Sequence, residues 1–248
     1  MGPTMFPYDP KILAAVQTPP QCVADVIRIM LSIDTTCSDS DGLKWFNRVY
    51  LQVTQAVETR ISSGGFTDPA WLAELDVQFA RLYFGALSTA LSGQKAPDCW
   101  QVLFERRDHA AIARIQFALA GINAHINHDL PAAIVNTCDA TSTIPQHSGT
   151  RYADYTGLNS TLDNLIDSAK QTLHVRLAGD ALPPVSHLND TIAAWSVSAA
   201  RESAWLNAEL LWHIRAFPPM DSAFMDTLDG LVTVVGTTLL VPVPDEGI

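Results

Sequence analysis

The stretch DPAWLAELDVQFARLYFGALSTALSG, residues 68–93, has the pattern of a long amphipathic helix. Asp68 followed by Pro69 is a helix start, because the carboxylate can cap free backbone N–H groups and proline lacks only an N–H that would be unbonded there. Gly93 marks the end of the run. Between these signals, apolar residues recur at steps of three and four: Trp71, Leu72, Leu75, Phe79, Leu82, Tyr83, Ala86, Leu87 and Leu91. This spacing predicts a helix with one buried face.

The rest of the chain shows the same periodicity. Residues 41–62 repeat it up to a Gly-Gly break, and we expect further helices at 20–34, 97–105, 108–128, 131–138, 153–177, 188–216 and 220–240. The last of these contains a Val-Thr-Val-Val run with strand propensity, but no second alternating run could pair with it. The sequence therefore predicts an all-α fold, a single-domain multi-helix bundle over residues 1–248. Its irregular parts are an N-terminal arm (1–18), a loop (139–150) and a tail (242–248).

Composition excludes several classes of protein. In 248 residues, 48% are hydrophobic and only 17% charged, which excludes disorder and predicts a deep core. The net charge is −11 and no basic stripe is present, so we expect no nucleic-acid partner. No apolar run is long enough to span a bilayer, so we expect no stable membrane insertion. The four cysteines lack metal-site or disulfide spacing and no signal-peptide pattern is visible, which predicts a cytoplasmic protein.

A second stretch, AGINAHINHDLPAAIV (residues 120–135), places five polar residues in an otherwise apolar helical segment. A helix that only fills a core would not carry them, because buried polar groups cost free energy unless they have partners. We therefore expect a central, buried polar helix that carries a functional site. The five residues are Asn123, His125, Asn127, His128 and Asp129.

His125 and Asp129 are four residues apart, so on a helix they project from one side, with His128 beside them. Such a pair suits a general acid/base, in which the carboxylate orients the imidazole. It also suits two ligands of a divalent ion. A purely structural interpretation remains open, since Asp129 could cap a new helix at Pro131, whose ring would clash with a helix continuing from residue 127.

Other predicted helices carry polar and aromatic residues among apolar ones. Because buried polar groups need one another, we expect these residues to converge on His125 and Asp129 and to form a substrate-binding pocket. Aromatic walls suit an apolar or cyclic small molecule, and the loop 139–150 is expected near the pocket mouth. The expected pocket residues are Asn47, Tyr50, Asp76, Tyr83, Arg201 and Trp205.

Four blocks of the sequence carry a family resemblance: FNRVY (46–50), LDVQFARLY (75–83), AGINAHINHDLP (120–131) and the segment 200–212. Over roughly residues 40–215 the chain resembles an uncharacterised all-helical microbial family, domain of unknown function 5995. The resemblance implies a compact helical protein. It also implies a tailoring role in secondary metabolism, or natural product biosynthesis.

We expect a small-molecule enzyme that performs acid/base chemistry such as cyclisation, isomerisation or hydrolysis. His125 would be the general acid/base, Asp129 would orient it, and Asn123 or Asn127 would position a substrate oxygen. No Gly-rich phosphate loop, GxSxG or HExxH motif is present, so no cofactor is expected. One alternative is a metal-dependent hydrolase that holds a divalent metal such as zinc with His125, His128 and Asp129. The other is a non-catalytic small-molecule binding protein.

Overall fold

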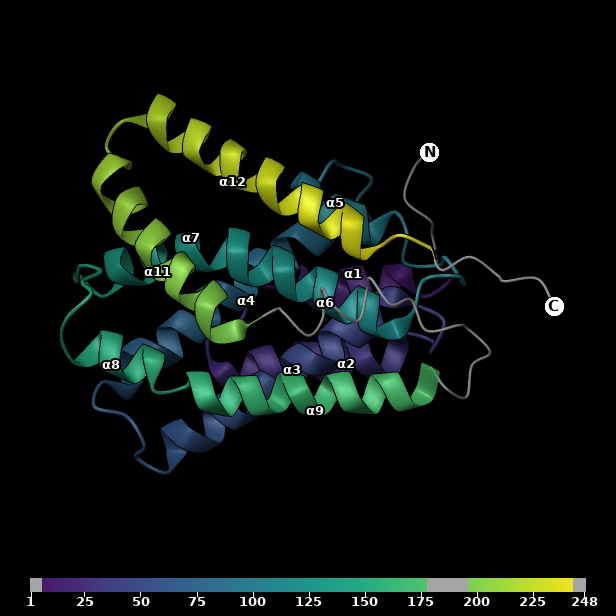
Figure 1. The fold of residues 1–248 in the computed structure, drawn as a ribbon, viewed down its shortest axis with the longest axis horizontal. Coiled ribbons are helices and arrows are strands. Elements are labelled where there is room, and N and C mark those ends of the chain that lie inside the picture. Colours follow the sequence, from purple (N-terminus) through teal and green to yellow (C-terminus); the bar gives the residue numbers. More distant parts are fainter. Residues whose placement is uncertain (1–5, 178–195, 243–248) are drawn as a thin grey trace.

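Helices form all the regular structure in the described part of the chain (Figure 1). The computed structural model describes residues 6–177 and 196–242. The N-terminal half contains α1 (Asp9–Val16), α2 (Val23–Thr36), α3 (Gly42–Ser62), α4 (Pro69–Leu91), α5 (Asp98–Phe104) and α6 (Arg114–Ala124). A five-residue π-helical turn, η1 (His125–Asp129), then leads into α7 (Leu130–Ala140). The remaining helices are α8 (Thr150–Thr156), α9 (Asn159–Leu177), α11 (Val197–Ile214) and α12 (Pro218–Leu239).

The segment α6–η1–α7 runs through the middle of the molecule, and other helices pack around it. α3 packs against α6, while α4 and α11 pack against α7. α9 covers α3 and α6, whereas α12 lies beside α5 at the opposite edge of the view (Figure 1). The polar turn η1 contacts α4, α11 and α12 as well as its own flanking helices. The predicted all-α fold with a central, buried polar helix is therefore confirmed.

Several predicted boundaries differ from the structure. The expected N-terminal arm contains a helix, α1, and the helix expected from residue 108 begins at Arg114. The segment 153–177 is divided between α8 and α9 near Gly157. Residues 188–195 and 243–248 lie outside the described residues. The β-branched run near the C-terminus is helical, because α12 packs on α5 and α6 and this packing overrides strand propensity.

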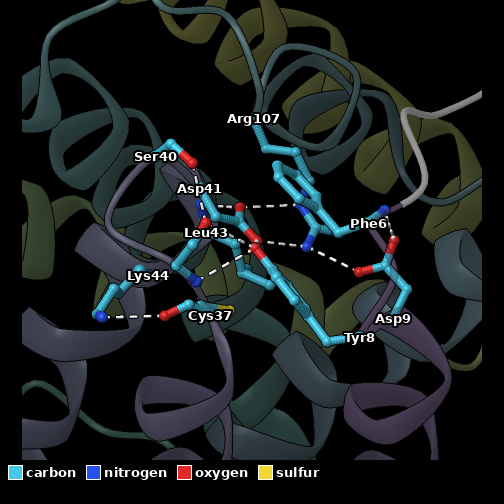
Figure 2. A network of polar contacts seen from close by, with 10 residues as sticks. Phe6, Tyr8, Asp9, Cys37, Ser40, Asp41, Leu43, Lys44 and Arg107 are labelled. Carbon is cyan, nitrogen blue, oxygen red and sulfur yellow. Dashed lines mark hydrogen bonds and ion pairs between the residues drawn. The ribbon is translucent and has the colours of Figure 1, made fainter.

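The N-terminal helix is anchored by a buried ion network (Figure 2). The guanidinium of Arg107 lies between two carboxylates: Nε donates to Asp41 Oδ1 at 2.9 Å, and Nη2 donates to Asp9 Oδ1 at 2.9 Å and to Asp41 Oδ2. Tyr8 donates its hydroxyl to Asp41, and the ring of Phe6 covers the guanidinium. The network joins α1 and the start of α3 to the segment that follows α5.

Replacing Arg107 with Met should strongly destabilise the protein. Two carboxylates would remain buried without their cation, a change that typically costs about 3–5 kcal/mol. Arg28→Met is the matched control, because Arg28 is exposed and, among the described residues, pairs with Asp25 one turn away, where water screens the charges and the ion pair contributes little to stability. Urea unfolding measures both losses. Equal losses for the two variants would contradict a structural role of the network.

Candidate active site

The polar segment is a π-helical turn within a continuous helix. The N–H of Leu130 donates to the carbonyl of His125, five residues back, and Asp129 has ordinary right-handed helical angles. Pro131 has no N–H to donate, and in a regular α-helix its ring would clash with the backbone carbonyl of the residue four positions earlier. A widened turn lets the chain pass the proline without ending the helix. Such turns occur frequently at functional sites.

The carboxylate of Asp129 is the centre of this turn. Its Oδ2 accepts from the indole N–H of Trp100 at 3.0 Å and lies 3.0 Å from Nδ1 of His125. Its Oδ1 lies 2.8 Å from Nδ1 of His128. The side chain makes no capping hydrogen bond to α7. The helix-cap interpretation of Asp129 is therefore wrong, because the carboxylate binds side chains from α5 and η1 instead.

The protonation of the three residues follows from these contacts. Burial favours the neutral form of Asp129, but the hydrogen bonds from His125 and His128 outweigh it and lower the pKa of the carboxyl. Burial lowers the pKa of His125, and this effect exceeds the opposite effect of Asp129, whose hydrogen bond and negative charge raise the pKa. For His128, burial is outweighed by Asp129 and the pKa is raised. Near neutral pH, His125 is thus a neutral imidazole that donates from Nδ1 to an ionised carboxylate.

The other nitrogen of His125 is a free acceptor in an apolar environment. His125 is 2% exposed, and among the described residues its Nε2 has no hydrogen-bond partner. Phe79 is stacked on the imidazole with ring centroids 3.4 Å apart, and Tyr50 meets it edge-on at 4.5 Å. Phe46, Tyr83 and Trp100 complete the aromatic surroundings.

A small cavity is lined by His125, and a second small cavity adjoins the first. The first, of about 60 Å³, is lined by His125 and by apolar residues of α3, α6, α9 and α11. The second, of about 50 Å³, extends towards Asp76. Tyr50, Phe79 and Arg201 line both cavities. Each has room for a few water molecules, since one water needs roughly 10–15 Å³ measured in this way.

Polar atoms without partners gather around the cavities. Like Nε2 of His125, Oη of Tyr50 and Oδ2 of Asp76 are buried and make no hydrogen bond with the described residues, and both side chains line a cavity. Each such group costs roughly 1–3 kcal/mol, so a cluster of them is expected only where a ligand or water completes the bonding. The cluster therefore indicates a binding site rather than a packed core.

Arg201 brings a buried positive charge to both cavities. Its Nη2 donates to the carbonyl of Tyr155 and its Nε to the side-chain oxygen of Asn159, both at 2.8 Å. The guanidinium also lies 3.9 Å from the centre of the Tyr155 ring. Burial lowers the pKa of Arg201, and the negative charge of Asp163 acts in the opposite direction at longer range. These direct partners are neutral, so the charge remains available to an anionic group in the cavity.

The structure brings together some of the expected site residues and separates others. His125, Asp129, Tyr50, Tyr83, Asp76 and Arg201 surround the cavities or the imidazole. Asn47 instead donates to the carbonyl of Met30 on α2. Asn123 donates to the carbonyl of Val232 and accepts from Asn127, so this pair faces α12 rather than a substrate.

Trp205 and the loop also differ from the expectation. The Trp205 ring packs against Trp71 and Tyr155, and its N–H donates to Glu209. In the segment expected at the pocket mouth, His147 binds Glu202 on α11, and no residue of 139–150 lines either cavity. Sequence spacing shows neither which neighbour a helix face meets nor where a loop lies on the folded protein, and so it cannot place Trp205 or the loop.

Two important residues were missed. The sequence pattern places Phe79 only on the apolar face of its helix, and Trp100 lies on a short helix without a polar motif. A buried indole N–H needs an acceptor, and this requirement was the available signal for Trp100.

His125, His128 and Asp129, the expected metal ligands, are not arranged around a common point where one cation could bind. Both oxygens of Asp129 already contact the two imidazole Nδ1 atoms. Among the described residues, the group whose ligand atoms lie close enough for one ion consists of Cys99, His128 and Asp229.

The fold and the site define an all-helical protein built around a buried carboxylate–imidazole pair. The family model described as "Family of unknown function (DUF5995)" matches residues 23–242, and the chain belongs to this family. This confirms the resemblance seen in the sequence. No curated protein and no solved structure matches the chain.

Among the described residues, none of the helices has the length and apolarity needed to cross a bilayer.

Replacing Asp76 with Asn should change how stability depends on pH. Burial, reinforced by the charge of Glu58, raises the pKa of Asp76 to about 7. Because the folded pKa exceeds the unfolded value, the stabilising contribution is complete at low pH and is lost as pH rises from about 4 to about 7. Each pKa unit is worth about 1.4 kcal/mol, so wild type should lose a few kcal/mol relative to Asp76→Asn over this range.

Denaturant unfolding of wild type and Asp76→Asn between pH 4 and pH 8 measures this difference. Asp226→Asn is the control, because it makes the same substitution at an exposed position. A stability difference between wild type and Asp76→Asn that does not change with pH would show that Asp76 ionises freely.

Proposed function

We propose that this protein is a small-molecule enzyme whose general acid/base is His125. One observation carries the proposal: His125 lines an apolar cavity, its buried Nε2 has no hydrogen-bond partner among the described residues, and its Nδ1 lies 3.0 Å from the buried carboxylate of Asp129. A base in this setting is oriented, shielded from water and able to accept a proton. The carboxylate stabilises the imidazolium that then forms.

The residues suggest how a reaction would proceed. Nε2 of His125 takes a proton from the substrate, and the same atom returns it at another position, so that the protein ends in its starting state. The hydroxyl group of Tyr50, which lines both cavities, is a buried donor that can stabilise negative charge developing on a substrate oxygen. This chemistry fits cyclisation or isomerisation, and also hydrolysis when water enters. None of these reactions needs a cofactor.

The cavity walls also suggest the substrate. Aromatic and aliphatic side chains suit an apolar or cyclic body. Arg201 supplies a positive charge for one anionic or strongly polar substituent, and Asp76 supplies a second titratable group at the far end. We further propose a role in natural product biosynthesis, in the cytoplasm, where the four free cysteines would remain reduced.

Incubation with a metabolite extract of the producing organism tests the proposal. Wild type should consume at least one compound and form a product of equal mass, or of that mass plus water. His125→Gln should lower the rate by roughly 10²–10⁴-fold, as expected when a general base is removed. His109→Gln is the matched control, because His109 is exposed and lies outside the cavity.

Circular dichroism establishes that each variant is folded. Equal turnover by wild type and His125→Gln would overturn the assignment of the base. A compound that wild type binds without converting it would favour the binding protein, for which the same unpartnered polar groups would serve as anchors.

A further inference from the structure

Three side chains of different chemistry meet beside Asp129, next to His128. Cys99 comes from the first turn of α5, His128 from η1 and Asp229 from α12. The thiol sulfur, an imidazole nitrogen and a carboxylate oxygen all lie within 4.8 Å of one another. Cys99 is buried, while His128 and Asp229 are half-buried. The group is therefore enclosed, and it is drawn from three separate segments.

The orientation of His128 suits a metal ligand. Its Nδ1 is occupied by the Asp129 carboxylate at 2.8 Å, so Nε2 is the nitrogen available for coordination. A carboxylate on the other nitrogen is the usual arrangement around metal-bound histidine, because it fixes the tautomer and increases the basicity of the ligand. Asp129 would therefore orient two imidazoles, one for proton transfer and one for a cation.

Asp229 is also held in place. Its two carboxylate oxygens accept the backbone N–H groups of Asp98 and Cys99, each at 2.8 Å. Each oxygen has a further lone pair that can reach a cation. These hydrogen bonds fix the carboxylate beside the thiol before any ion binds.

We propose that Cys99, His128 and Asp229 bind a divalent transition metal ion, with zinc as the best match. Thiolate, imidazole and carboxylate are all zinc ligands, and the thiolate disfavours magnesium and calcium. Binding releases the thiol proton of Cys99. One thiolate and one carboxylate then balance the two positive charges of the ion, and a water molecule completes a four-coordinate shell. The ion joins α5 and α12 to η1.

This proposal does not depend on the proposed acid/base function, because the ligands lie outside the two cavities. Its test is direct metal binding. Tag-free, metal-free protein is titrated with Co²⁺, which replaces Zn²⁺ and gives a thiolate-to-cobalt charge-transfer absorption only when sulfur is a ligand. The expected result is saturation at one equivalent, with the absorption competed away by Zn²⁺.

Matched variants identify the ligands. Cys99→Ser should abolish the charge-transfer absorption, whereas Cys22→Ser, which removes the exposed cysteine, should keep it. His128→Gln and Asp229→Asn retain the thiol and should weaken Co²⁺ binding. Asp129→Asn keeps all three ligands but removes the carboxylate that orients His128, so it should weaken Co²⁺ binding by roughly 10–100-fold.

Two outcomes would overturn the proposal. One is the absence of a thiolate absorption from folded wild type at saturating Co²⁺. The other is an absorption that survives Cys99→Ser and is lost in Cys22→Ser, which would place the ion at the surface cysteine. If Cys99→Ser fails to fold, the comparison of His128→Gln with Cys22→Ser still decides, because equal Co²⁺ affinities for these two would exclude His128 as a ligand.

Discussion

The burial of one ionised carboxylate is the constraint on which the site depends. Asp129 is 3% exposed and lies within a helix, where water cannot solvate it. Its charge is tolerated because three side-chain donors surround it: the indole of Trp100 and the imidazoles of His125 and His128. Losing any of these donors would leave a buried anion with too few partners, which is costly in a low-dielectric interior.

The backbone and the packing around the carboxylate follow from the same constraint. A π turn places the residues of one short segment against α4, α11 and α12, and brings Asp129 to Trp100 of α5. Gly121 permits a close approach on the preceding turn, since a Cβ there would lie 2.3 Å from the ring of Phe46. Phe46 in turn contacts His125, so a glycine one turn before the motif helps to set one wall of its aromatic surroundings.

Much of this arrangement could be predicted from the sequence, and the limits have physical causes. Helical periodicity identified most helices because each buries an apolar face, and the polar run at 123–129 stood out because polar groups are costly in such a helix. The face of a helix does not reveal its partner, which is why Asn47 and Trp205 were assigned to the site. The π turn was not predicted either, because Pro131 is equally compatible with a helix end.

The central claim is that Asp129 holds His125 as a neutral imidazole with a free Nε2. Long-range ¹H–¹⁵N NMR of histidine-labelled protein, titrated through the acidic range, measures both the tautomer and the pKa, and His125→Gln assigns the signals. We predict a proton on Nδ1, an unprotonated Nε2 and a pKa below the usual histidine value, in keeping with burial. A proton on Nε2 at neutral pH, or a pKa of His125 above the usual value, would contradict the account.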